Sequence, residues 1–200
     1  MLLSIGYRRH LKKKATYQKG DILLFNETFY RDDKDLLDFT NSEIISRKAV
    51  RAIILNDNKM LMIFVEKTKE YKFPGGGIEK NESIEEALER EVLEETGYSV
   101  INIIQKIGMT TEYAIAMEDK DHIFKMVSEY YITKISNSQI EQKLDNYEAE
   151  LMYKPCWIDI KTAYKANKNI LENKCDLTPW IKRETRVLEM LCQGRKDGII

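Results

Sequence analysis

The sequence contains few of the residues that crosslink small folds. Its 200 residues include three cysteines, Cys156, Cys175 and Cys192, and only two histidines. The cysteines are odd in number and no two follow a CxxC spacing, so we expect neither a disulfide framework nor a structural zinc site. A chain of this length can bury an adequate core without such crosslinks. The cysteine usage favours a reducing cytoplasm.

Long apolar segments are also absent. The longest stretch without a charged residue is the ten residues from Thr96 to Gln105, whereas a membrane-spanning helix needs about 18 or more apolar residues. We therefore expect no membrane-spanning helix. A net charge of −1 gives no bulk electrostatic attraction to nucleic acid. The 43% apolar and 32% charged residues are typical of a globular domain.

The charge is unevenly distributed along the chain. Residues 8–19 contain six lysines and arginines and no acid, whereas residues 79–95 contain eight glutamates against one lysine and one arginine. The basic block could contact nucleic acid or phosphate, but a solvated arm is the simpler interpretation. The acidic block is the more informative feature.

Secondary-structure signals become clear only after the first 45 residues, which we interpret as an N-terminal extension. Residues 50–55 and 60–65 are apolar and β-branched, and the polar residues between them favour a β-hairpin. Further strands are expected around 99–108, 123–135 and 156–160. A short helical piece is expected over 162–166, and a longer helix over 177–192 with Gly194 after its end.

The strongest helix signal extends from Ser83 to Tyr98. Ser83 and Glu86 have the spacing of a capping box, and Gly97 is placed to end the helix. Glu91, Glu94 and Glu95 then share one face of the last turn, where like charges repel and the helix dipole is already negative. A helix selected for stability would carry lysine or arginine there. A solvated acidic face is one interpretation; a site for Mg²⁺ or Mn²⁺, which prefer oxygen ligands, is the favoured one.

Two neighbouring features suit a phosphate ligand. The segment Pro74–Gly77 supplies backbone without bulky side chains, so a ligand can approach it closely. Arg90 can pair with Glu94 or with this loop, and so orient the carboxylates. A divalent cation beside an open backbone loop suits a polyphosphate, because the cation neutralises phosphate oxygens.

The segment from Gly76 to Tyr98 resembles the Nudix box. The family pattern GX5EX7REUXEEXGU, where U is a bulky apolar residue, is matched without a gap over 23 residues. Tyr98 is an aromatic residue where an aliphatic one is commoner. The resemblance implies that a Nudix hydrolase domain covers residues 46–195, outside the extension at 1–45. It implies an α/β fold, an α/β/α sandwich around a mixed β-sheet.

The resemblance also implies an activity and a set of site residues. The expected reaction is hydrolysis of the pyrophosphate bond in a nucleoside diphosphate derivative, with Mg²⁺ or Mn²⁺ as cofactor. Three glutamates and a backbone carbonyl are similar to the family's metal ligands. Arg90 is similar to the family residue that positions a ligand carboxylate, and Glu82 is similar to a supporting carboxylate. The expected metal ligands are Glu91, Glu94, Glu95 and the carbonyl of Gly76.

The general base and the substrate are left open by the motif. Glu91 is one candidate for the base, and Glu148 and Glu150, ahead of Trp157, are loop candidates, although each could be an ordinary surface acid. The substrate could be a nucleoside triphosphate or a nucleotide sugar similar to ADP-ribose. An RNA 5′ end and a non-catalytic nucleotide-binding role are the alternatives. The expected partner is a small nucleotide, and a homodimer is compatible with the sequence.

Overall fold

The computed structural model describes residues 23–33, 37–174 and 177–196. The basic block at 8–19 therefore lies outside the described residues. Within these ranges the chain forms seven strands and four helices. The strands are β1 (Phe25–Tyr30), β2 (Ile44–Asn56), β3 (Lys59–Val65), β4 (Glu70–Lys72), β5 (Tyr98–Ile115), β6 (Ile123–Gln139) and β7 (Tyr153–Asp159). The helices are α1 (Ile84–Thr96), α2 (Asn146–Leu151), α3 (Ile160–Asn173) and α4 (Ile181–Lys196).

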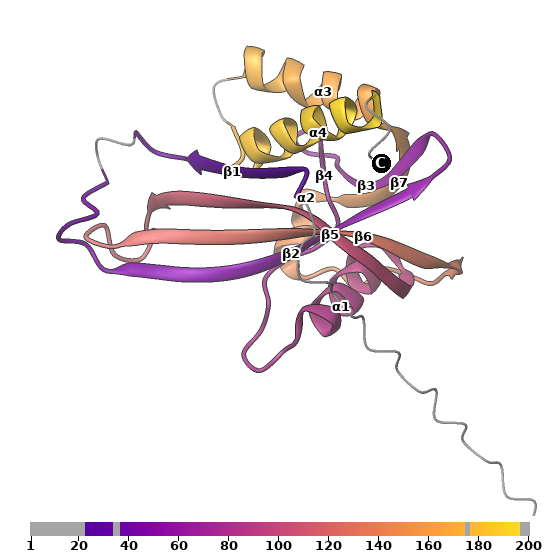
Figure 1. The fold of residues 1–200 in the computed structure, drawn as a ribbon, viewed down its shortest axis with the longest axis horizontal. Helices are drawn as coiled ribbons and strands as arrows, with labels where there is room; N and C mark the ends of the chain where they lie inside the picture. Colours follow the sequence, from indigo (N-terminus) through magenta and orange to yellow (C-terminus); the bar gives the residue numbers. More distant parts are fainter. Residues whose placement is uncertain (1–22, 34–36, 175–176, 197–200) are drawn as a thin grey trace, which may run out of the picture.

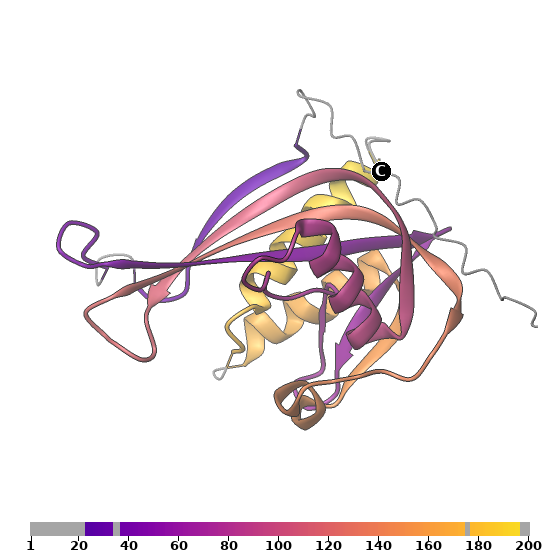
Figure 2. The ribbon, with the colours of Figure 1, turned by 90° about the horizontal axis from the view of Figure 1, so that it is seen from below.

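The strands form a mixed sheet with helices on both faces, which confirms the expected α/β/α sandwich. The strand order is β1-β5-β6-β2-β3-β4, with β7 paired to the other edge of β3. β1 is parallel to β5 and β2 is parallel to β6, whereas the remaining pairs are antiparallel. Helices α3 and α4 cover one face and α1 covers the opposite face (Figures 1 and 2). Over the described ranges, no helix has the length and apolar character needed to cross a membrane.

The β2–β3 hairpin confirms the sequence expectation. Residues 54–56 pair with residues 59–61. Asp57 in the turn adopts φ 50°, a left-handed conformation that aspartate tolerates better than most residues.

Part of the N-terminal extension joins the sheet. Phe25 in β1 lies opposite Gly108 in β5 and packs edge-on against Tyr130, with ring centroids 5.2 Å apart. A side chain at Gly108 would put its Cβ 2.3 Å from the Phe25 ring, so glycine is what admits this contact. The division of the chain at residue 46 stays a prediction.

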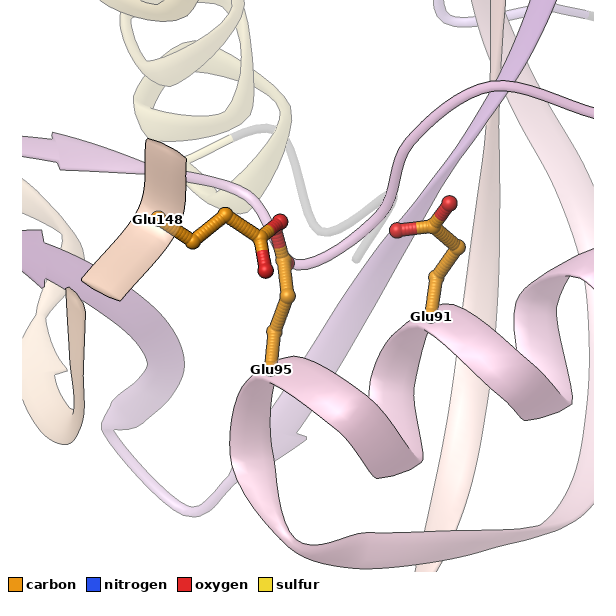
Figure 3. Close-up of side chains that lie close together, drawn as sticks. All are labelled: Glu91, Glu95 and Glu148. Atoms are coloured by element: carbon orange, nitrogen blue, oxygen red, sulfur yellow. The ribbon is translucent and has the colours of Figure 1, made fainter. Parts of the chain in front are cut away.

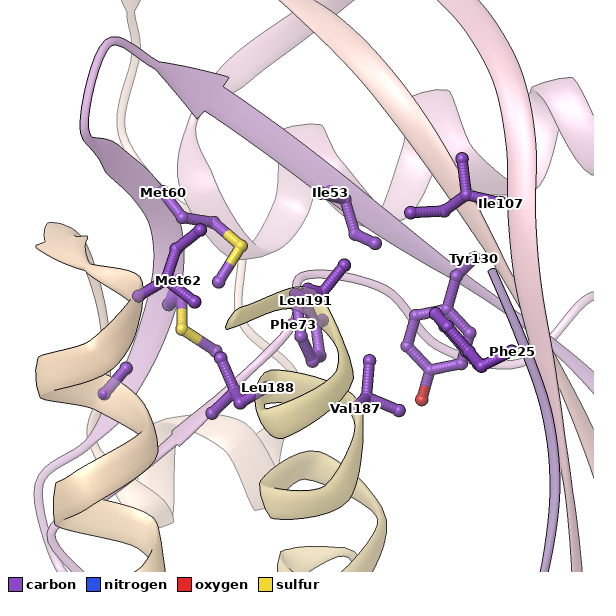
Figure 4. Close-up of a cluster of buried hydrophobic side chains, with 12 residues drawn as sticks. Phe25, Ile53, Met60, Met62, Phe73, Ile107, Tyr130, Val187, Leu188 and Leu191 are labelled. Atoms are coloured by element: carbon purple, nitrogen blue, oxygen red, sulfur yellow. The ribbon is translucent and has the colours of Figure 1, made fainter. Parts of the chain in front are cut away.

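The core lies on both sides of the sheet because the side chains of β2 alternate between its faces. Val50, Ala52 and Ile54 pack toward α1. Ile53 packs with Phe73 and Tyr130 against α3 and α4 in the larger cluster (Figure 4). Each face therefore has its own apolar layer, and the site described below lies where β2, α1 and the loop after β4 meet.

The C-terminal helices differ from the sequence expectation. α3 covers residues 160–173, well beyond the expected 162–166, and α4 begins at Ile181 rather than at residue 177. Gly194 lies inside α4 instead of after its end. A Cβ at Gly194 would lie 3.0 Å from the Leu24 side chain. The glycine therefore allows Leu24, the residue directly before β1, to pack closely on the helix.

Candidate metal and hydrolase site

Helix α1 positions two of the acidic side chains, and its ends are fixed as the sequence predicts. The Ser83 hydroxyl accepts a hydrogen bond from the Glu86 N–H, and the Glu86 carboxylate accepts one from the Ser83 N–H at 3.0 Å. Gly97 ends the helix at φ 75°. These caps set the register that directs Glu91 and Glu95, one turn apart, toward the same side of the helix.

Three carboxylates converge at the end of α1. Glu91 and Glu95 from α1 and Glu148 from α2 each offer an oxygen, and these oxygens all lie within 4.8 Å of one another (Figure 3). Glu95 is 1% exposed and Glu91 8% exposed, and Glu148 is half-buried. Three carboxylates this close in a largely buried position repel one another, so nearby positive charge stabilises them.

Glu148 reaches the cluster because the segment before α2 caps the C-terminal end of α1. The Ile140 N–H donates to the Gly97 carbonyl and the Lys143 N–H to the Glu94 carbonyl, both at 2.9 Å. The Gln142 side-chain amide donates to the Glu95 carbonyl at 2.5 Å. These donors satisfy carbonyls that a helix end otherwise leaves unpaired, and they anchor the chain that enters α2.

A buried lysine holds Glu95. The Lys72 Nζ lies 2.6 Å from a Glu95 oxygen and 4.4 Å from the centre of the Tyr153 ring. The Gly75 N–H donates to the other Glu95 oxygen at 2.8 Å. Sequence reasoning missed Lys72. The sequence places Lys72 between Tyr71 and Phe73, and side chains that follow one another in an extended segment point in alternating directions. This alternation could have indicated that Lys72 points to a different side from the two aromatic rings.

Arg90 connects the remaining carboxylates to the glycine loop. It forms a two-pronged ion pair with Glu82 at 2.7 and 2.9 Å and donates to the Gly77 carbonyl at 3.0 Å. Its Nη1 also contacts Glu91 at 2.8 Å and Glu94 at 3.3 Å. A planar guanidinium with several bonds fixes the orientation of its partners better than a single point charge. Glu82 thus supports Arg90, and Arg90 supports Glu91.

The glycine loop approaches Glu91 closely. A Cβ at Gly76 would lie 2.4 Å from the Glu91 carboxylate, so a larger residue would displace that side chain. The Gly76 carbonyl accepts a hydrogen bond from the Val50 N–H at 3.0 Å. A carbonyl oxygen has a second lone pair, which leaves it able to bind a further ligand.

The electrostatics of the cluster favour proton uptake when no cation is bound. Burial and the nearby Glu95 charge raise the pKa of Glu148 to about 7. Burial and Glu95 also raise the pKa of Glu91, although Arg90 and Arg51 oppose that rise. Glu82 behaves in the opposite way, because its bonds to Arg90 hold its pKa below the ordinary value.

Two predicted residues lie outside the three-carboxylate cluster. The Glu94 side chain is 39% exposed and its carboxylate faces Arg90. The Glu150 side chain is 73% exposed and pairs with Lys67 at 3.1 Å on the surface. The structure thus brings Glu148, but not Glu150, to the box glutamates.

The donor set fits a hard divalent cation. Carboxylate oxygens at short range, with a backbone carbonyl beside them, are the ligands that Mg²⁺ and Mn²⁺ prefer. The cluster offers no sulfur or imidazole ligand, which distinguishes it from the usual zinc sites.

The chain is similar in sequence to known proteins. Residues 45–181 match the family model described as the NUDIX domain. A Bacillus subtilis (strain 168) protein, named as a candidate 8-oxo-dGTP diphosphatase, is 36% identical over 73 residues, which cover 36% of this chain and 47% of that protein.

The fold is similar to that of a solved structure. A NUDIX hydrolase from Nitrosomonas europaea aligns over 75% of this chain and 90% of its own, with 21% identity and a TM-score of 0.50. A structure titled as an ADP compounds hydrolase aligns over 77% and 76%, with 17% identity and a TM-score of 0.47. Because the family match extends over most of its length, this chain belongs to the NUDIX domain family.

Proposed function

We propose that this protein hydrolyses the pyrophosphate bond of a nucleoside diphosphate derivative with the aid of Mg²⁺ or Mn²⁺. The observation that carries the proposal is the convergence of Glu91, Glu95 and Glu148 within 4.8 Å. Members of this family are pyrophosphohydrolases and generally use divalent metal ions. All carboxylates of the box are present, which favours turnover over a purely binding role.

Glu91 and Glu95 would hold the metal ion, with Glu94 and the Gly76 carbonyl as further ligands. A bound divalent ion supplies positive charge that neutralises phosphate oxygens during substitution at phosphorus. Lys72 and Arg90 keep Glu95 and Glu91 in place before the ion arrives. This preorganisation matters because carboxylates that had to reorient would bind the ion more weakly.

Glu148 is the favoured general base. Its carboxylate is half-buried and has no ion pair among the described residues, so it would be free to take a proton from an attacking water and to release that proton afterwards. Its oxygen lies next to those of the proposed ligands (Figure 3), so it would be within reach of a water held at that site. Glu150, paired with Lys67 on the surface, has no such neighbours.

The substrate class is proposed from the relatives and the site together. The Bacillus subtilis relative is named for a nucleoside triphosphate, which supports a nucleoside triphosphate, normal or oxidised. A nucleotide sugar similar to ADP-ribose remains within the proposal, because nucleotide preference depends on residues outside the box.

The test is a product-release screen. Nucleoside triphosphates, 8-oxo-dGTP and nucleotide sugars are incubated with Mg²⁺ or Mn²⁺, and nucleoside monophosphate is measured. We expect metal-dependent release by the wild type, loss in Glu95→Gln and retention in Glu150→Gln, the matched control on the surface. If none of these substrate classes is hydrolysed with either ion, the proposal is contradicted.

A further inference from the structure

Within the described residues the fold buries three basic side chains, and one of them differs from the other two. Arg183, 2% exposed, is paired with Glu112 and Glu184, and Lys72 is paired with Glu95. Arg51 is 7% exposed, yet among the described residues none forms an ion pair with it and none accepts a hydrogen bond from its Nε. A buried guanidinium nitrogen without a hydrogen-bond acceptor is costly. Such a residue therefore points to an anion that binds there.

Arg51 lies directly behind the loop that contacts the carboxylate cluster. It belongs to β2, and its Cα is 3.0 Å from the position that a Cβ on Gly75 would occupy. Gly75 donates its N–H to Glu95, and the next residue, Gly76, abuts Glu91. One short loop thus separates the backbone of Arg51 from both proposed metal ligands. The positive charge of Arg51 also opposes the rise in the pKa of Glu91 that burial causes.

The sheet face that carries Arg51 holds several polar atoms beside its apolar cluster. Arg51 is opposite Tyr130 in β6, and Ser128, two residues earlier, is opposite Thr110 in β5. Strand alternation places these side chains on one face. The hydroxyl oxygens of Tyr130, Ser128 and Thr110 are buried without a hydrogen-bond partner. Unsatisfied polar atoms in such numbers are uncommon in a core that has only a packing role.

We propose that Arg51 binds an anionic oxygen of the substrate's diphosphate group beside the carboxylate cluster. This inference rests on the proposed function. Lys72 and Arg90 already form ion pairs with Glu95 and Glu91. Arg51 has no such partner, so its positive charge is available to the phosphate that the metal ion does not bind. Its planar fork suits two phosphate oxygens at once. Arg51 is thus a substrate-positioning residue outside the box.

The test separates phosphate binding from effects on the metal. The probe is methylenediphosphonate, a diphosphate that cannot be hydrolysed and carries no base, titrated by calorimetry in saturating Mg²⁺. We expect Arg51→Gln to weaken its binding about 10- to 100-fold and Arg51→Lys to restore part of it. Arg186→Gln, on an exposed arginine paired with Glu27 and Glu189, is the matched control and should bind as the wild type does.

Two further measurements distinguish a structural role. Mn²⁺ affinity without the probe should be unchanged or higher in Arg51→Gln, because a positive charge near the metal has been removed. The melting temperature of the metal-free variant should equal or exceed that of the wild type, because an unpaired buried charge is lost. Melting several degrees lower, or a parallel fall in Mn²⁺ affinity, would show that Arg51 supports the fold or Glu91 instead.

Failure of this inference can be told apart from failure of the proposed function. Equal probe affinity in Arg51→Gln and wild type, or no probe binding to the wild type, overturns the role of Arg51. If the wild type still releases nucleoside monophosphate in the screen, the proposed hydrolysis stands without it. Conversely, if probe binding depends on Arg51 but the protein hydrolyses no nucleotide, the diphosphate site is supported and the proposed hydrolase activity is contradicted.

Discussion

Replacing Glu148 by glutamine should stabilise the metal-free protein while reducing its activity. The folded chain raises the pKa of Glu148 from 4.5 to about 7, chiefly through burial and then through Glu95. The folded state therefore holds this proton more tightly than the unfolded state, and the ionised carboxylate destabilises the fold. The effect is absent below about pH 4.5 and is complete above about pH 7. Stability thus falls as pH rises through that window.

The size of the effect follows from the pKa and the exposure. A change from 4.5 to about 7 corresponds to about 3 kcal/mol for a fully shielded group. Glu148 is half-buried, so solvent screening reduces this to about 1–2 kcal/mol. For a chain of 200 residues that is a rise in melting temperature of about 2–8 °C. Glutamine preserves the capping box at the start of α2, because its side-chain oxygen can still accept from the Asp145 N–H.

The assay is thermal unfolding in EDTA at pH 5 and pH 8. We expect Glu148→Gln to melt above the wild type at pH 8 and the gap to shrink at pH 5. Glu150→Gln, two residues along the same short helix, removes only a surface ion pair and should change stability little at either pH. If Glu148→Gln melts below the wild type at pH 8, or if the gap does not depend on pH, the electrostatic reasoning about this cluster is wrong.

Three further outcomes are expected. Glu95→Gln should weaken Mn²⁺ binding in calorimetry at least 10-fold, and it should also lower stability, because it leaves the buried Lys72 without its ion pair. Gly76→Ala should reduce kcat, because its Cβ would displace the Glu91 carboxylate; unchanged kcat would show that the loop adjusts freely. Arg183→Met should lower the free energy of unfolding by about 3–5 kcal/mol, measured by urea denaturation, because it leaves buried carboxylates uncompensated.

The local features of the site could be predicted from the sequence because they depend on neighbours in the chain. Ser83, Glu86 and Gly97 fix the ends of α1 by hydrogen bonds that span a few residues. The hairpin turn near Asp57 is set by local backbone preference. The i, i+3, i+4 spacing placed the box glutamates on one side of the helix.

What the sequence could not show is which of these acids turns inward. That depends on what packs against each one. Glu95 meets Lys72, which lies 23 residues earlier in the chain, and Glu94 turns outward to Arg90. Glu148 is brought in by hydrogen bonds from residues 140–143 to the end of α1. Tertiary contacts of this kind carry no periodic signal in one sequence.

The end of α1 shows how the fold tolerates an arrangement that is unfavourable for a helix alone. Its carbonyls are capped by N–H groups from residues 140 and 143 rather than by basic residues in the last turn. Lys72 and Arg90 compensate Glu95 and Glu91 from outside that turn. Glu148 then adds a third carboxylate for which the described residues provide no ion pair. Arg90 is also shared with Glu82 and Glu94, so the carboxylates around this helix end outnumber the cations that pair with them, and this excess negative charge is the electrostatic basis of the proposed metal site.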